Sequence, residues 1–193
     1  PLINDDGSFT TLTTTTSVVD EYTIVSVDYV YVNNPKSNDG VYFTNNTTIS
    51  EILEWGKIPL TRNWNFTSEE YMGNNHFNNF TGKISTTGDD VPTILQNTSF
   101  RNLFLQFSAT DNSDYGNISN WNTQGVIEFR SMFYGQSLFN HDVSNFDFSS
   151  AKGFSCLINV FTNCTNFNNG QAPGESTAPL TIDCGTAENL SGL

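Results

Sequence analysis

The sequence is poor in charge, and above all in positive charge. Only 14% of its residues are charged, and 7 Lys and Arg stand against 20 Asp and Glu, which gives a formal net charge of −13. The few basic residues are scattered along the chain and form no patch. Binding to nucleic acid or to an anionic membrane requires clustered Lys and Arg, so this composition argues against nucleic-acid binding.

Long apolar runs and metal-binding motifs are also missing. No run of about 18 apolar residues occurs, so we expect no membrane insertion. The chain has only two histidines, His76 and His141, which are far apart in sequence, and it has no C-x-x-C pair. We therefore expect no zinc site and no cofactor.

Cysteine is scarce as well, with Cys156, Cys164 and Cys184 all in the last quarter of the chain. An odd number allows one disulfide and one thiol. Either Cys164–Cys184 or Cys156–Cys184 would tie the C-terminal tail to the preceding repeat. Three buried, reduced thiols are the equally good alternative.

Residues 1–60 are predicted to form a β-rich N-terminal segment. Thr, Val and Tyr are frequent over 9–44, and the turn-forming residues of 33–40 predict a β-hairpin. Thr48 and Glu51 fit a capping box, and the apolar residues that follow have helical spacing. We expect a helix over about 49–56 that covers the end of the next region.

Residues 61–170 are rich in Phe and Asn and repeat themselves. Fourteen of the 16 Phe lie at or beyond residue 66, and residues 118–132 align on 143–157 at an offset of 25. A three-residue insertion at 157–160 then restores the match as far as Phe167–Asn168. Units starting near 64, 84, 118 and 143 indicate a stack of repeats, followed by a tail over 171–193.

Each unit is expected to bury one apolar stripe. In the best unit Val126, Phe129, Met132 and Phe133 are spaced as on one face of a short helix, which Gly135 would end. The Asn after the second Phe is expected to bond the adjacent unit. The predicted repeat core comprises Ile118, Trp121, Val126, Phe129, Met132, Phe133, Phe139, Asn140, Val143, Phe146, Phe154, Phe161, Phe167 and Asn168.

The segment ISNWNTQGVIEFRSMFYGQSLFNHD (118–142) resembles the BspA-like leucine-rich repeat family. The resemblance implies an α/β repeat fold, a short leucine-rich-repeat-type solenoid with the β-rich segment as its N-terminal cap. It also implies adhesion or protein binding at a cell surface, with no catalytic residues to carry over. The insertions at 84–117 and 157–160 depart from the family's pattern.

Catalytic and metal sites are the sharper alternatives. Adjacent carboxylates such as Glu69–Glu70 and Asp89–Asp90 suit a solvated face better than a glycosidase cleft. The loop TDNSDYGN (110–117) offers Asp111 and Asp114 as the best candidates for a metal ion, but Tyr115 interrupts the calcium-loop order. We therefore predict no catalytic residues and no metal.

The function expected from the sequence is a non-enzymatic repeat module, extracellular or on a cell surface. Its partner would be a protein, either a host surface protein or the neighbouring subunits of an assembly. A structural component of a virion, such as a minor capsid, fibre or decoration protein, is the alternative. A carbohydrate-binding module ranks third, because Trp121 aligns with Phe146 as a core position does, and only Trp64 remains open.

Overall fold

A computed structural model describes residues 2–3, 9–10, 40, 42–43, 47, 49–56, 59–65, 70–71, 76–152, 155–172 and 175. Contacts divide the chain into two units, Pro1–Val32 and Asn33–Leu193. In the first unit, β1 (Leu2–Ile3) pairs antiparallel with β2 (Phe9–Thr10). Most of the β-rich segment expected over 9–44, including the hairpin turn, lies outside the described residues.

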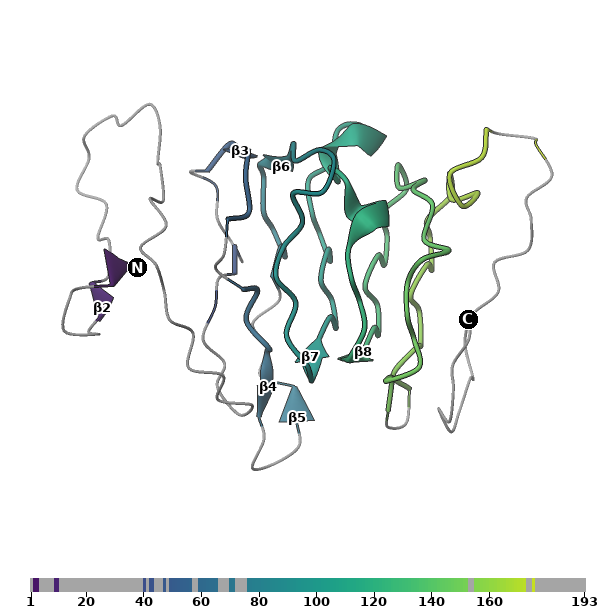
Figure 1. The fold of residues 1–193 in the computed structure, drawn as a ribbon. Coiled ribbons are helices and arrows are strands. Elements are labelled where there is room, and N and C mark those ends of the chain that lie inside the picture. The colour runs from purple at the N-terminus through teal and green to yellow at the C-terminus, as the bar shows by residue number, and fades with distance from the viewer. Residues whose placement is uncertain are drawn as a thin grey trace. The chain divides into compact units, whose positions relative to one another are not determined.

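The second unit holds short strand pairs and two 3-10 helices (Figure 1). Two of the pairs are parallel and join segments far apart in sequence, and one is antiparallel. The parallel pairs are β3 (Glu51–Ile52) with β6 (Lys83–Ile84), and β7 (Thr98–Ser99) with β8 (Val126–Glu128). The antiparallel pair is β4 (Trp64–Asn65) with β5 (Glu70–Tyr71), and the 3-10 helices are η1 (Asn112–Asp114) and η2 (Ile118–Asn120).

The predicted α/β solenoid of leucine-rich-repeat type is wrong. The described residues contain no α-helix, their strands are two or three residues long, and no sheet has more than two strands. They do not form a closed leucine-rich-repeat-type solenoid. None of their helices could cross a membrane.

Tight turns and a ladder of hydrogen bonds between passes of the chain take the place of regular elements. We call one such pass a coil. Within a coil, an N–H bonds the carbonyl three residues before it, as in Met132 N to Phe129 O at 3.0 Å. Other N–H groups of the coil donate hydrogen bonds to carbonyls of the next coil, as Phe104 N does to Met132 O at 2.9 Å. The same ladder continues through Phe129 N to Cys156 O, Ser131 N to Ile158 O, Phe133 N to Val160 O and Gly135 N to Thr162 O.

Residues with positive φ prevent the segment around 126–135 from forming a helix. Ser131 has φ of 54° and Gly135 has φ of 77°, both in the left-handed region. Left-handed residues interrupt an α-helix, and Gly and Asn tolerate them best. Equivalent places in the neighbouring coils are also left-handed, at Asn102, Gln106, Asn159 and Asn163. Consecutive three-residue turns thus give the apolar spacing that predicted a helix over 126–133.

The helix expected over 49–56 is wrong for a related reason. Ile52 and Trp55 are buried whereas Leu53 is 57% exposed, and Glu51–Ile52 is an extended segment paired with Lys83–Ile84. The Glu51 carboxylate bonds Lys83 Nζ across this pair at 2.9 Å. Pairing with the neighbouring coil therefore replaces helix formation here.

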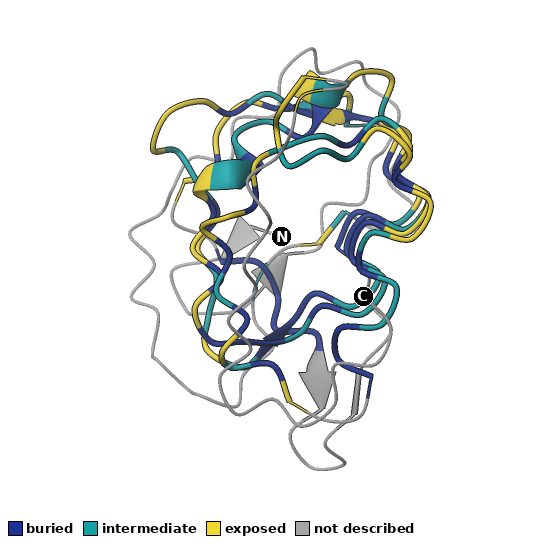
Figure 2. Cartoon of the chain, turned by 90° about the vertical axis from the view of Figure 1, so that its right-hand side faces the viewer, coloured by how far each residue is buried: buried dark blue, intermediate teal, exposed yellow. Residues whose placement is uncertain are grey.

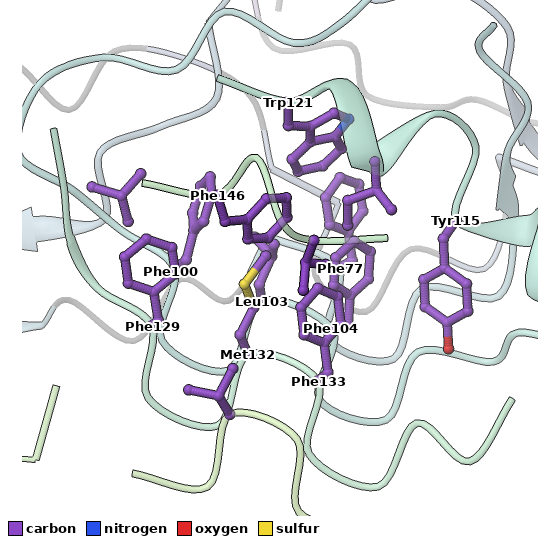
Figure 3. Packing of buried hydrophobic residues seen from close by; sticks show 14 of the residues in the cluster. Phe77, Phe100, Leu103, Phe104, Tyr115, Trp121, Phe129, Met132, Phe133 and Phe146 are labelled. Atoms are coloured by element: carbon purple, nitrogen blue, oxygen red, sulfur yellow. The ribbon is translucent and has the colours of Figure 1, made fainter. Parts of the chain in front are cut away.

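Aromatic rings fill the core in a stacked series that we call the aromatic column. Phe77 and Phe104 have ring centroids 5.1 Å apart, Phe104 and Phe133 5.5 Å, and Phe133 and Phe161 5.6 Å, with each pair parallel within 9°. Phe43 continues the column beyond Phe77, at 5.5 Å. Figure 3 shows Phe77, Phe104 and Phe133 packed together, with Trp121 above them and Tyr115 to their right.

The structure changes the alignment of the last two coils. Phe129 N bonds Cys156 O and Phe133 N bonds Val160 O, so Leu157, rather than Phe154, lies beside Phe129. Further back, Lys152 N bonds Ile127 O. The extra residues therefore precede Leu157, whereas the sequence alignment placed them after it.

Candidate interaction surface

One face of the second unit presents side chains in repeated rows. Viewed along the stack, successive passes overlie one another, with buried residues inside and exposed ones outside (Figure 2). We define the ladder face as the outward residues of the three coils joined by the ladder. They are Arg101, Asn102, Leu105, Gln106 and Ser108, then Arg130, Ser131, Tyr134, Gly135 and Ser137, then Ile158, Asn159, Thr162, Asn163 and Thr165.

Two arginines occupy the same row of the ladder face. Asn102 N bonds Arg130 O, which places Arg101 beside Arg130 on adjacent coils. The Arg101 guanidinium lies 3.8 Å from the Glu128 carboxylate, and Glu128 also accepts from Ser99 Oγ at 2.9 Å. Arg130 donates to the neutral Ser155 Oγ at 3.3 Å. This strongly acidic chain thus places two cations side by side on its ladder face.

Apolar and aromatic groups form the next row. The Tyr134 side chain is 37% exposed, and its neighbour in the preceding coil, Leu105, is half-buried. Arg and Tyr are the residues that most often carry binding energy in protein interfaces, because they combine large contact area with polar atoms. Arg130 and Tyr134 are therefore the ladder-face residues to test first for a role in binding.

Most residues predicted for the repeat core lie inside the molecule. Phe161, Phe167, Asn140 and Asn168 are only partly buried, and Phe154 lies outside the described residues. The others are buried, namely Ile118, Trp121, Val126, Phe129, Met132, Phe133, Phe139, Val143 and Phe146.

The asparagines at the ends of the repeats join one coil to the next. Asn140 N bonds Asn112 Oδ1, and Asn168 N bonds Asn140 Oδ1, both at 2.7 Å and both across 28 residues. Asn140 Oδ1 also accepts from Gly170 N at 3.2 Å, and Asn140 Nδ2 donates to Gln171 O at 3.0 Å. The side chains of Asn112 and Asn140 thus satisfy backbone groups of the coil that follows.

The candidate metal ligands are used by the protein itself. Asp114 is 8% exposed, and its Oδ2 accepts from Thr110 N, Thr110 Oγ1 and Asp111 N at 2.7–3.0 Å. Asp111 Oδ1 accepts from Ser113 N, and this bond lowers the pKa of the Asp111 carboxyl. No group of three or more possible metal ligands gathers anywhere in the described part of the chain.

The hydrogen bonds of both histidine rings go to backbone carbonyls. The Nε2 of His76 lies 2.7 Å from Thr61 O, and burial lowers the pKa of His76 from 6.5 to about 4. The Nε2 of His141 lies 2.7 Å from Asn112 O, and burial lowers the pKa of His141 as well. Burial thus favours the neutral form of both rings.

Cys164 is buried, and its Sγ lies 3.0 Å from Phe133 O. Burial raises the pKa of the Cys164 thiol to about 11, which makes it unreactive at neutral pH. Cys156 is buried too, and Cys184 lies outside the described residues. Each pairing with Cys184 therefore stays a prediction.

Residues 96–173 match the family model DUF285, described as a Mycoplasma protein of unknown function. The matched segment is less than half of the 193-residue chain and contains the three coils of the ladder face. No curated protein and no solved structure matches the chain.

The sequence analysis did not single out the ladder face. The signal was available, since FRNLF (100–104) and FRSMF (129–133) repeat the Phe-Arg pair and so align Arg101 with Arg130. The basic residues had been judged scattered because they are far apart in sequence. The backbone ladder brings these two together.

Proposed function

We propose that this chain is a non-enzymatic repeat module that binds a partner protein through its ladder face. The observation that carries the proposal is the alignment of Arg101 with Arg130 and of Leu105 with Tyr134 on coils joined by backbone hydrogen bonds. Because the aromatic column holds these coils at fixed spacing, the face loses little conformational entropy on binding.

The location proposed is the cell surface or the extracellular space. Two features support it: a surface made polar by Asn, Ser and Thr rather than by charge, and the resemblance of 118–142 to the repeats of BspA-like surface proteins. The match of 96–173 to DUF285 agrees with a repeated sequence over this segment. A protein partner is proposed because the face is broad, and its Arg and Tyr rows suit protein contacts.

The test compares three forms of the whole chain, each displayed on beads and exposed to surface proteins of the source cells and their hosts. The forms are the unaltered chain, the double variant Arg130→Glu with Tyr134→Ser, and the control Asn145→Glu, at an exposed position outside the ladder face. We expect one protein to bind the unaltered chain, with a dissociation constant about 100-fold higher for the double variant. The reason is that a residue at the centre of an interface contributes more than about 1 kcal/mol to the binding free energy. Equal binding to all three forms would refute the proposal.

A further inference from the structure

The last coil of the ladder has an open edge. In each earlier coil, alternate N–H groups donate to carbonyls of the next coil, as Ser131 N does to Ile158 O at 2.9 Å and Phe133 N to Val160 O at 3.0 Å. The equivalent groups of the last coil are the N–H groups of Asn159, Phe161 and Asn163. Within the described part of the chain, these three donate no hydrogen bond.

The aromatic side chains of this coil are also less covered than those of the coil before it. Phe133 and Phe139 are 0% exposed, whereas the equivalent Phe161 and Phe167 are only partly buried. Phe161 and Phe167 stack on each other at 4.2 Å and within 5°. Among the described residues, no further ring stacks on the outer face of this aromatic pair, as these two rings do on Phe133 and Phe139.

The series of hydrogen bonds between asparagines of successive coils also ends at this coil. Asn112 Oδ1 accepts from Asn140 N, and Asn140 Oδ1 accepts from Asn168 N. The Nδ2 of Asn168 donates to Ala172 O, but its Oδ1 accepts no hydrogen bond within the described residues. An N–H placed where the next asparagine would stand would complete the series.

We propose that this open edge, made of Asn159, Phe161, Asn163, Phe167 and Asn168, binds one further coil supplied by a partner protein other than a second copy of this chain. The incoming segment adds in parallel and brings carbonyls on alternate residues to the three N–H groups, as in strand addition to a sheet edge. Its Phe-x5-Phe-Asn spacing places two rings on Phe161 and Phe167 and an asparagine N–H at Asn168 Oδ1. This edge uses the backbone N–H groups of Asn159 and Asn163, which also belong to the ladder face, but it does not include Arg130 or Tyr134, so the inference does not depend on the proposed function.

The chain itself supplies a probe with this spacing. In residues 155–168 the carbonyls of Ile158, Val160 and Thr162 already accept from the preceding coil. A synthetic peptide of this sequence, with both cysteines changed to serine, carries the groups that the edge requires. A matched control peptide has serine in place of Phe161 and Phe167.

The experiment is amide hydrogen exchange on the full chain with each peptide. Peptide binding should slow exchange at Asn159, Phe161 and Asn163 by at least about tenfold. It should leave Ile158, Thr162 and Cys164 unchanged, because their N–H groups already bond within their own coil. The control peptide should have no effect, and a chain carrying Tyr134→Ser on the ladder face should respond as the unaltered chain does.

Three results would overturn the proposal. The first is no protection by the peptide at millimolar concentration, or protection spread evenly over the coil. The second is slow exchange of the three amides in the chain without peptide, if deletion of residues 176–193 makes that exchange fast. The chain's own tail would then be what binds the edge. The third is concentration-dependent protection without peptide, which would assign it to a second copy.

Discussion

At the scale of single residues, phenylalanine has the role in this hydrophobic core that aliphatic residues have in most protein cores. Phe133 is 0% exposed and contacts rings on both neighbouring coils and within its own, with centroids 5.5 Å from Phe104, 5.6 Å from Phe161 and 3.9 Å from Phe139. A ring that stacks on both sides joins three coils at once. Its removal leaves a cavity that the hydrogen-bonded backbone cannot close.

The substitution Phe133→Ala should therefore lower the free energy of unfolding by about 3–5 kcal/mol. The matched control is Tyr134→Ala, the next residue along the chain, whose side chain is 37% exposed and should cost no more than about 0.5 kcal/mol. Urea unfolding followed by circular dichroism measures both. Similar losses for the two variants would show that Phe133 does not hold the coils together.

His76 makes stability depend on pH. Burial lowers its pKa from 6.5 to about 4, so between these values the unfolded chain binds a proton that the folded chain does not. Stability is therefore complete above pH 6.5, falls as the pH drops towards 4, and loses about 3 kcal/mol in total at about 1.4 kcal/mol for each unit.

The measurement is urea unfolding at several pH values between 7 and 4, for the unaltered chain and for His76→Gln. Glutamine stays polar but does not titrate, so the variant should lose most of the pH slope. His141 has its pKa shifted in the same direction and leaves a smaller slope in both proteins. Parallel slopes for the two proteins would mean that His76 is protonated without cost in the folded state.

At the scale of elements, apolar spacing predicted which residues face inward but not the backbone that turns them there. A spacing of three residues fits a helix and also fits consecutive tight turns. The choice depends on left-handed residues, and Ser131, with φ of 54°, is not a residue whose identity predicts such a conformation. Tertiary pairing between coils imposes it, through the bond from Ser131 N to Ile158 O.

The same limit applies to the candidate surface. The repeated Phe-Arg pair was visible at 100–101 and 129–130, and the F-x5-FN spacing was visible at 133–140 and 161–168. The sequence could not predict the register between coils. Extra residues before Leu157 change the spacing between paired residues part-way along one pair of adjacent coils. The ladder of hydrogen bonds fixes Arg101 beside Arg130, and within the described residues it leaves the N–H group of Phe161 without an acceptor.

The asparagine joints give a prediction at this scale. Asn140→Ala removes the oxygen that accepts from Asn168 N and Gly170 N and the amide that donates to Gln171 O. Leaving such groups unpaired should cost about 1–3 kcal/mol. Thermal unfolding measures the loss, and Asn145→Ala, at an exposed position, should leave the melting temperature unchanged. A melting temperature unaltered by both substitutions would show that water replaces the joint at no cost.

At the scale of the whole molecule, the second unit, Asn33–Leu193, has a hydrophobic core of its own. Its core is continuous from Ile52 to Cys164, and hydrogen bonds join its coils in series. A unit with its own core can fold alone, which makes its boundary testable.

A fragment of residues 33–193 should therefore unfold cooperatively. Its free energy of unfolding should lie within about 1 kcal/mol of the full chain's, a small part of the roughly 5–15 kcal/mol typical of folded proteins. A fragment of residues 96–193 keeps the segment that matches DUF285 but lacks Trp55 and Phe77, which pack on Trp121 and Phe104. It should lose the cooperative transition, because Phe104 and Trp121 would then be exposed at a new end. Cooperative unfolding of the shorter fragment, or its absence from the longer one, would show that the boundary of the folded unit lies elsewhere.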